Sequence, residues 1–587
     1  MPTEFKPTRW SLEDIIPEPV EPALEALFTE LDKQATAFES VRNSLTDTIE
    51  PAEFQRIISD YEALLRHAYR AHAYVQLLFF SDLKNQKALN LRDRIDQVLT
   101  GIDNRTLFFT LWLKDLSPEA AERLAPDGDY RYYLQNLLKY KPYTLGESEE
   151  QIINLKDTNG INAVVRLYDM ITSGFTFTVE ENGEKKTLTR DQVAALYRHP
   201  LPEARAAAYQ ELFRVYDENS TVLAQIYSHR VRDWYSENMT LRHYPTPISA
   251  RNLNNDIPDE VIDVLLEVCR ANNDLFQRYF KLKAGWLGVD KLRRYDIYAP
   301  LTSSDKTFEF AESVDLIIDS FRRFSPEIAD MAMQIFTDQH IDAEIRPNKR
   351  SGAFCYSILP GMTPWVHVNY TGKARDVATL AHELGHAIHG IISGDHSLLT
   401  YHPSLPLAET ASVFSEMLLT DRLLAVETDP AVRKDILANA IDDAYATVQR
   451  QSYFTLFERE AHKKIMGGKI VNELCDTYLD NLREQFGDTV DLSDDFRWEW
   501  ITIPHIYHTP FYTYAYSFGQ LLVLSIYQQY RREGESFVPR YKKLLAYGGS
   551  EEPAKVLQEA GFDIASAEFW QGGYDVLCGM IDELEQL

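Results

Sequence analysis

The chain reads Asp376-Val-Ala-Thr-Leu-Ala-His-Glu-Leu-Gly-His-Ala-Ile-His-Gly-Ile391 in the stretch that decides its fold. The apolar residues of this stretch recur at steps of three and four, and that spacing predicts a helix with a single apolar stripe. Asp376 falls near the expected first turn, where a carboxylate suits the positive end of the helix dipole. Gly390 and Gly394 follow as positions at which the helix can stop.

Two histidines four residues apart lie on one face of this predicted helix. His382 and His386 can therefore both direct a ring nitrogen at one metal ion about 2.0–2.1 Å away. Glu383 lies about 100° further round the helix, beside the ion, where it can take a proton from a metal-bound water as general base. Gly385 in mid-helix indicates that another part of the chain passes close by. The alternative is a chance motif on a solvated helix face, and the apolar stripe disfavours it.

A third ligand decides the class of metal site. The metzincin pattern continues as His-x-x-Gly-x-x-His, but His389 and Ile392 occupy the two positions it needs, so that class is excluded. The other solution is a glutamate on a later helix, and the segment that Pro406 opens contains Glu409 and Glu416. These two are seven residues apart and share a helix face, so spacing leaves both open. We expect His389, one turn beyond the motif, to pack or to support a ligand rather than to bind the metal.

Net charge excludes several classes of partner. The chain has 587 residues with 89 acidic and 60 basic side chains, which gives a formal net charge of −29. Such a surface repels nucleic-acid phosphates and anionic lipid, so we expect neither nucleic acid nor a membrane as partner. The charge serves solubility or attracts basic peptides, and composition leaves both readings open.

Targeting and redox features favour the cytoplasm. The amino terminus has no apolar segment typical of a secretory signal, and no apolar run approaches the roughly 18 residues of a membrane span. The four cysteines are scattered, without a Cys-x-x-Cys pair, which is typical of a reducing compartment; they are Cys269, Cys355, Cys475 and Cys578.

Most of the remaining sequence predicts helices. Apolar residues at helical spacing mark the segments Pro22–Ser44, Tyr61–Phe80, Leu89–Ile102 and Val261–Trp286. A hairpin is expected where Phe175–Val179 and Lys186–Thr189 flank Asn182-Gly183. A further strand is expected at Trp365–Tyr370.

The motif and its surroundings resemble one known family. His-Glu-Leu-Gly-His-Ala-Ile-His is followed, 27 residues after His382, by Glu-Thr-Ala-Ser-Val-Phe-Ser-Glu. Together with other stretches, these motifs resemble the oligoendopeptidase F group of the thimet-oligopeptidase-like zinc peptidases. The resemblance implies Glu409 as third ligand, one Zn²⁺ per chain, and a supporting or structural role for Glu416. The other similar stretches are Asn159–Phe177, Tyr295–Leu301, Gly352–Cys355 and Val368–Gly372.

The resemblance also implies a fold. It is a large, mainly α, two-lobed zincin-type metallopeptidase with a deep central channel and a few short β-strands. Such a channel admits short unfolded peptides, and an edge strand at Gly352–Phe354 or Trp365–Tyr370 would bind the substrate backbone. We expect a helical amino-terminal segment over residues 1–115, a helical segment with the hairpin over 116–200, and the zinc metallopeptidase catalytic domain over 201–587.

An aromatic tract over residues 503–519 is the second candidate for chemistry. It contains two histidines and four tyrosines, whose N–H and O–H groups can stabilise an oxyanion. Relatives in the family use a histidine and tyrosines from a similar tract. We select His508, Tyr514 and Tyr516, while His505 and Tyr512 stay open because the register is ambiguous. The alternative is aromatic packing in a core.

The sequence thus predicts a zinc-dependent endopeptidase that hydrolyses internal bonds of short, unstructured oligopeptides. One alternative is a dipeptidyl carboxypeptidase-type exopeptidase, which needs a cationic residue to bind the chain terminus. The other is a catalytically silent peptide-binding protein, which has no need of Glu383. The oligomeric state stays open.

Overall fold

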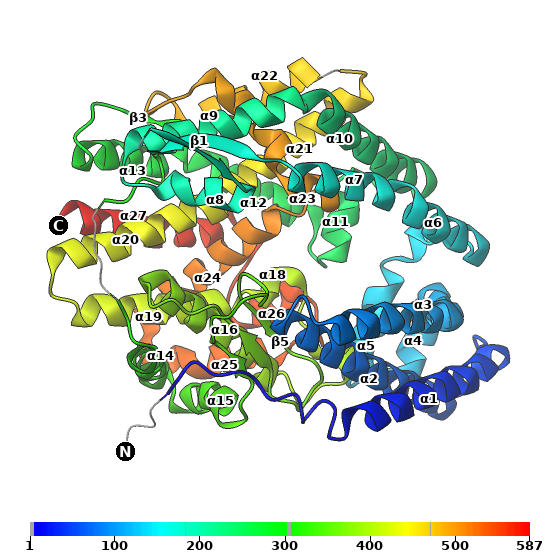
Figure 1. Ribbon diagram of the computed structural model, residues 1–587. Helices are drawn as coiled ribbons and strands as arrows, with labels where there is room; N and C mark the ends of the chain where they lie inside the picture. Colours follow the sequence, from blue (N-terminus) through cyan, green and yellow to red (C-terminus); the bar gives the residue numbers. More distant parts are fainter. Residues whose placement is uncertain (1–4, 182, 302–306, 470) are drawn as a thin grey trace. The chain divides into compact units, whose positions relative to one another are not determined.

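The computed structural model describes residues 5–181, 183–301, 307–469 and 471–587, and they form helices with a few short strands (Figure 1). The predicted mainly α fold class is therefore confirmed. Tertiary contacts divide the chain into two units. Unit 1 comprises Met1–Thr144, Lys306–Ala425 and Gln529–Phe562, and unit 2 comprises Leu145–Asp305, Val426–Gln528 and Asp563–Leu587. The three-segment division expected from the sequence stays a prediction. Across the described residues, every helix is too short or too polar to cross a membrane.

Unit 1 combines an amino-terminal group of helices with a small sheet and the metal-motif helix. Its helices are α1 (Val20–Glu39), α2 (Pro51–Ser81), α3 (Gln86–Asp115), α4 (Pro118–Leu124), α5 (Asp129–Leu138), α14 (Phe310–Phe324), α15 (Pro326–Thr337), α16 (Ala374–Ile392), α17 (Leu398–Tyr401), α18 (Leu405–Ala408), α19 (Ser412–Val426), α25 (Val538–Ala546) and α26 (Pro553–Glu559). Its strands are β4 (Ile341–Asp342), β5 (Phe354–Tyr356) and β6 (Trp365–His367).

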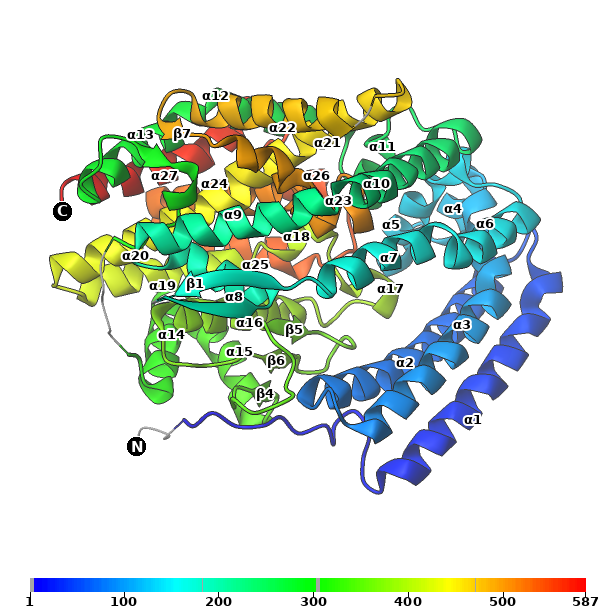
Figure 2. The same ribbon diagram turned by 45° about the horizontal axis from the view of Figure 1, so that its top comes forward.

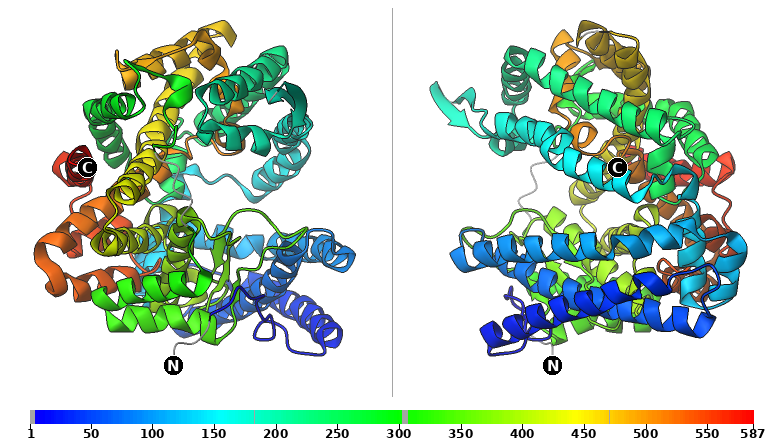
Figure 3. Two further views of the ribbon diagram at one scale, coloured as in Figure 1. Left: turned by 60° about the vertical axis from the view of Figure 1, so that its left-hand side comes forward. Right: turned by 90° about the vertical axis from the view of Figure 1, so that its right-hand side faces the viewer.

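The helices α1, α2 and α3 lie side by side (Figures 1 and 2), and Figure 3 shows the same arrangement from two further sides. They contain the helices predicted at Tyr61–Phe80 and Leu89–Ile102, whereas the one predicted at Pro22–Ser44 ends as an α-helix at Glu39 and continues as a 3₁₀ segment to Ser44. One apolar cluster joins them to the sheet, because Leu31, Leu64 and Ile95 are buried together with Trp365 of β6. The Trp365 indole N–H also donates to the Ser11 carbonyl at 2.8 Å. This packing fixes α2 beside β5.

The sheet of unit 1 supports the metal-motif helix. Its strand order is β4-β6-β5, with β4 parallel and β5 antiparallel to β6. β5 is thus an edge strand, and α16 packs against both β5 and β6. The strand predicted at Trp365–Tyr370 is present, although it ends at His367.

Unit 2 is also mainly helical. Its helices are α6 (Glu147–Asn159), α7 (Ile161–Ser173), α8 (Arg190–Ala195), α9 (Pro202–Glu218), α10 (Ser220–Tyr235), α11 (Ser249–Asn254), α12 (Asp259–Ala271), α13 (Asn273–Trp286), α20 (Pro430–Ala444), α21 (Arg450–Met466), α22 (Val471–Phe486), α23 (Pro504–His508), most of α24 (Tyr514–Glu533) and α27 (Ala567–Glu585). Its strands are β1 (Phe177–Glu181), β2 (Glu184–Leu188), β3 (Leu292–Arg293) and β7 (Val490–Asp491).

Short 3₁₀ or π segments complete both units. They are η1 (Ser40–Ser44), η2 (Lys141–Tyr143), η3 (Leu196–Arg198), η4 (Ser236–Leu241), η5 (Arg294–Asp296), η6 (Tyr445–Gln449), η7 (Asp494–Thr502) and η8 (Gly534–Phe537).

Two predictions for unit 2 can be compared directly with its structure. The hairpin is confirmed: β1 pairs antiparallel with β2, in register Phe177 with Leu188, and Gly183 has the positive φ of +81° that the turn requires. Asn182 lies outside the described residues. The helical pattern over Val261–Trp286 is correct in type, but it is two helices, α12 and α13, that meet at Asn272.

Candidate metal centre

The metal-motif helix begins where its sequence predicts. α16 starts at Ala374, and the Asp376 carboxylate accepts hydrogen bonds from the backbone N–H groups of Thr371 at 2.7 Å and Lys373 at 3.1 Å. These bonds satisfy donors at the helix start that have no partner within the helix. The apolar stripe faces the interior, since Val377 and Leu380 are buried.

Three side chains of unit 1 form a candidate metal site: His382, His386 and Glu409 each offer a ligand atom, and these atoms lie within 4.8 Å of one another. The Glu409 Oε2 is 3.4 Å from the His382 Nε2 and 3.5 Å from the His386 Nε2. Ligands of a tetrahedral zinc ion at about 2.1 Å are separated by about 3.4 Å. The donor set and its spacing therefore fit a zinc ion with three protein ligands.

Each candidate ligand is held by a further contact. The His382 Nδ1 lies 2.6 Å from the Glu416 Oε1, which leaves Nε2 directed at the site. The Ala408 carbonyl lies beside the rings of both His386 and His389 and raises the pKa of each against the larger effect of burial. Among the described residues, the candidate group does not include His389, whose supporting role stays a prediction.

The electrostatics of the site are dominated by burial and by neighbouring carboxylates. Burial lowers the pKa of His382, but the hydrogen bond that His382 donates to Glu416 and the charges of Glu416 and Glu409 outweigh it and raise that pKa to about 9. Burial lowers the pKa of His386 to about 4. Burial also raises the pKa of Glu383 to about 7, with the Glu409 charge adding to the effect.

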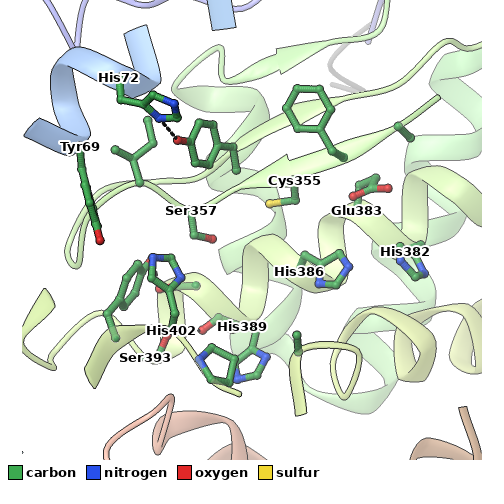
Figure 4. Close-up of a pocket in the computed structure, with 18 residues that line it drawn as sticks. Tyr69, His72, Cys355, Ser357, His382, Glu383, His386, His389, Ser393 and His402 are labelled. Atoms are coloured by element: carbon green, nitrogen blue, oxygen red, sulfur yellow. Dashed lines mark hydrogen bonds between the residues drawn. The ribbon is translucent and has the colours of Figure 1, made fainter. Parts of the chain in front are cut away.

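Glu383 lies beside the three candidate ligands without joining them. It is buried on α16, and the backbone N–H of Cys355 in β5 donates to its carboxylate. Together with His382 and His386, it lines one end of a cavity of about 650 Å³ within unit 1 (Figure 4). The carboxylate is thus fixed at the cavity surface, next to the candidate metal position.

The segment carrying the third candidate ligand differs from the prediction. A single helix containing Glu409 and Glu416 was expected, but α18 ends at Ala408 and α19 begins at Ser412, so Glu409 lies at the junction. Close packing explains the break. A Cβ on Gly385 would lie 2.6 Å from the Ala411 carbonyl oxygen, so the junction passes directly over Gly385. The close approach predicted from this glycine is therefore present.

The aromatic tract of unit 2 forms a different cluster from the one selected by sequence. His505 lies parallel to Tyr512 at 6.0 Å between ring centroids, and the Tyr516 hydroxyl lies 3.4 Å from the His505 Nε2. Tyr514 is fully buried and its hydroxyl accepts from Asn255 at 2.8 Å, which suits packing. His508 instead pairs with Asp169 at 2.8 Å. The geometry therefore groups Tyr516 with His505 and Tyr512, and separates it from His508 and Tyr514.

The turn before α24 is held by one face of α21. Phe511 has a φ of +58°, unusual for a residue with a side chain. Its backbone N–H donates to the buried Glu458 carboxylate at 2.9 Å, and its ring lies 4.5 Å from that of His462. Thr455, one turn earlier on α21, hydrogen-bonds Thr513 at 2.8 Å. Sequence reasoning missed Glu458 and His462, although their four-residue spacing on one face of a helix was a usable signal.

Two family models match the sequence of this chain. The family model described as Peptidase family M3 matches residues 195–576, and the model described as Oligopeptidase F matches residues 113–177. Oligopeptidase PepF of Bacillus subtilis is 24% identical, covering 98% of this chain and 87% of the relative. The chromosomal oligoendopeptidase F of Lactococcus lactis subsp. cremoris is 26% identical, covering 97% and 98% respectively.

A solved structure from Chlamydophila abortus has a similar fold. It superposes with a TM-score of 0.87 at 24% identity and covers 100% of this chain and 99% of the other. At this identity the likeness shows the fold alone.

Proposed function

The chain belongs to peptidase family M3, a metallopeptidase family, and from that premise we propose that it is a zinc-dependent endopeptidase acting on internal bonds of short, unstructured oligopeptides. The observation that carries this proposal is the group formed by His382, His386 and Glu409. The Glu409 Oε2 lies 3.4 Å from the His382 Nε2 and 3.5 Å from the His386 Nε2, and Glu383 lies beside this group. The resemblance to oligoendopeptidase F found in the sequence agrees with the family match.

Two imidazoles and one carboxylate are a donor set that zinc favours, and three protein ligands leave a position open for chemistry. When bound there, zinc would polarise the scissile carbonyl and make a water molecule more acidic. The chain's own contribution is to present His382 and His386 through Nε2 and to hold Glu409 against them. We propose one ion per chain.

Glu383 is the proposed general base. Its carboxylate is fixed by the Cys355 backbone N–H at the cavity wall, so it can accept the proton of an attacking water. It can then deliver that proton to the nitrogen of the leaving amine as the C–N bond breaks.

From the resemblance of the sequence, we propose that residues of the aromatic tract supply hydrogen-bond donors to the oxyanion of the tetrahedral intermediate. Of the residues selected from the sequence, Tyr516 is the one that clusters with His505 and Tyr512, and it is the first to test. His508 and Tyr514 remain predictions of the sequence alone. Each donor of this kind contributes about 10²–10³ in kcat in enzymes where it has been removed.

The competing functions differ in what they require. An exopeptidase needs a cation to bind the terminal carboxylate, and among the cavity-lining residues that the structure describes there is no lysine or arginine. A silent peptide-binding protein needs neither the base nor the ligands. The four cysteines, all within the described residues, are unpaired, which supports the expected reducing compartment.

Metal content and peptide cleavage test the proposal together. The purified protein should contain about one zinc per chain and cut quenched fluorescent peptides internally, and a chelator should abolish cleavage until zinc is restored. Glu383→Gln should keep its zinc and lose about 10²–10⁴ in kcat. Arg375→Gln removes a charge from an exposed position of the same helix and should change neither the zinc content nor kcat. Metal-free protein that cuts no peptide, or full activity in Glu383→Gln, would contradict the proposal.

A further inference from the structure

The cavity beside the metal centre extends far beyond the residues of the motif. It runs along α16 from His386 past Gly390 to Ser393, a distance of about 10 Å at the rise of a helix. Its remaining walls come from β5 and the residues after it, from Tyr401 and His402, and from α2 (Figure 4). All these elements lie within unit 1. The cavity therefore has room for a side chain next to the metal site.

The wall contributed by α2 comes from a part of the chain outside both family matches. Tyr69 and His72 line the cavity, whereas the matches cover residues 113–177 and 195–576. The Gln76 side-chain N–H donates to the His72 Nε2 at 3.2 Å, so the proton of His72 lies on Nδ1 and is donated to the Tyr356 hydroxyl at 3.1 Å. The Tyr356 O–H then remains to donate into the cavity.

Beyond its metal end, this cavity carries no formal charge. Among the lining residues that the structure describes, Glu383 is the one carboxylate, and none is a lysine or arginine. Burial lowers the pKa of both His72 and His402, which favours the neutral form of each imidazole. The lining is otherwise rich in rings and includes Tyr69, Phe354, Tyr356 and Tyr401.

We propose that this cavity binds the side chain of one of the two residues flanking the scissile bond, that it selects uncharged and preferably aromatic side chains, and that Tyr69 and His72 set this selectivity. The proposal rests on the proposed peptidase function and adds a substrate class to it. It also gives the amino-terminal helices, through α2, a direct part in substrate choice.

The physical basis is the difference between burying a ring and burying a charge. A substrate ring in the cavity gains apolar contact and edge or face contacts with the lining rings. A charged side chain in the part of the cavity beyond Glu383 would lose its water without meeting a counter-charge there, which is strongly unfavourable. A tyrosine side chain could in addition accept the hydrogen bond from Tyr356.

Peptide series and one charge-introducing variant test the assignment. Two sets of quenched peptides vary the residue on either side of one scissile bond among Phe, Tyr, Gln, Lys and Glu. In one set, kcat/KM should be about 100-fold higher for Phe or Tyr than for Lys or Glu. Tyr69 is 41% exposed, so Tyr69→Glu should fold normally. In that set it should raise kcat/KM for Lys relative to Phe by about 10-fold or more.

The matched control is Ala63→Glu, which adds the same charge to an exposed position of α2 that does not line the cavity. It should leave the ranking of peptides unchanged. Equal kcat/KM for charged and aromatic residues in both sets would overturn the selectivity, and an unchanged ranking in Tyr69→Glu would overturn the role of α2. If no peptide is cut with zinc present, the peptidase function itself fails, and that outcome differs from both.

Discussion

Replacing Gly385 with alanine should separate a local effect of helix propensity from the packing that forms the metal site. In an ordinary helix interior, Gly→Ala stabilises by about 1 kcal/mol, because alanine loses less conformational freedom on folding. At Gly385 the new Cβ would lie 2.6 Å from both the Ala411 carbonyl oxygen and the Ser412 Cα, and 2.8 Å from the Ser415 hydroxyl. Two of these three neighbours are backbone atoms, so rotating a side chain cannot relieve the overlap.

The size of the effect follows from these distances. Ordinary contact begins near 3.4 Å, so the α18–α19 junction must move by about 0.8 Å. Overpacking of this kind costs about 1–3 kcal/mol, which equals or exceeds the gain in propensity. Glu409 lies two residues before Ala411 and must move with it, although zinc ligands tolerate displacements of only about 0.2 Å. Both stability and zinc affinity should therefore fall.

Gly101 provides the matched comparison. It lies within α3 of the same unit, and a Cβ there would meet nothing within 4 Å. Gly101→Ala should therefore raise the melting temperature of the metal-free protein. The free energy of unfolding of Gly385→Ala should be about 1–3 kcal/mol lower than that of Gly101→Ala. Thermal unfolding and zinc titration against a competing chelator measure the two effects. If Gly385→Ala stabilises as much as Gly101→Ala and binds zinc like the wild type, the close packing inferred at Gly385 is wrong.

Three further changes test other parts of the structure. Glu416→Gln should weaken zinc binding by about 10- to 100-fold, because its carboxylate orients His382; unchanged affinity in a chelator competition would contradict this. Tyr516→Phe should lower kcat by about 10²-fold with little change in KM, whereas the buried Tyr514→Phe should stay within about twofold; the reverse order in steady-state kinetics would exclude the cluster. Burial raises the pKa of Glu458 to about 8, above its ordinary value, so the wild type should lose stability relative to Glu458→Gln as the pH rises from about 5 to 8. If urea unfolding gives a constant difference in stability between the two proteins across that range, this prediction is wrong.

The parts of the site that could be predicted from sequence are those fixed by helical repeat. His382 and His386 share a face because they are four residues apart, and Glu383 follows from the same geometry. The start of α16 near Asp376 could be predicted for the same reason, since capping depends on neighbours in sequence. For these residues, local periodicity was enough to predict the arrangement that the structure has.

The parts that could not be predicted depend on contacts between distant segments. The interruption between Ala408 and Ser412 results from packing against Gly385, so seven-residue spacing with Glu416 gave no sign of it. The separation of Tyr514 from Tyr516 depends on which side of α24 faces the core. Tyr69 lies about three hundred residues before the motif, and no pattern in α2 connects it to the metal site.

The contacts around Glu409 explain why a helix break is useful at the proposed third ligand. In a continuous helix, the positions of Glu409 and Glu416 would be coupled. Glu416 already hydrogen-bonds His382, so Glu409 could not be placed independently of that contact. With the break, Glu409 is placed separately: the preceding Ala408 carbonyl lies beside the rings of His386 and His389, and Ser412 donates to the Glu409 Oε2 at 2.7 Å. The proposed third ligand and the support of the proposed first ligand can thus be oriented independently. Zinc affinity should accordingly be sensitive to the packing of α16 against this junction.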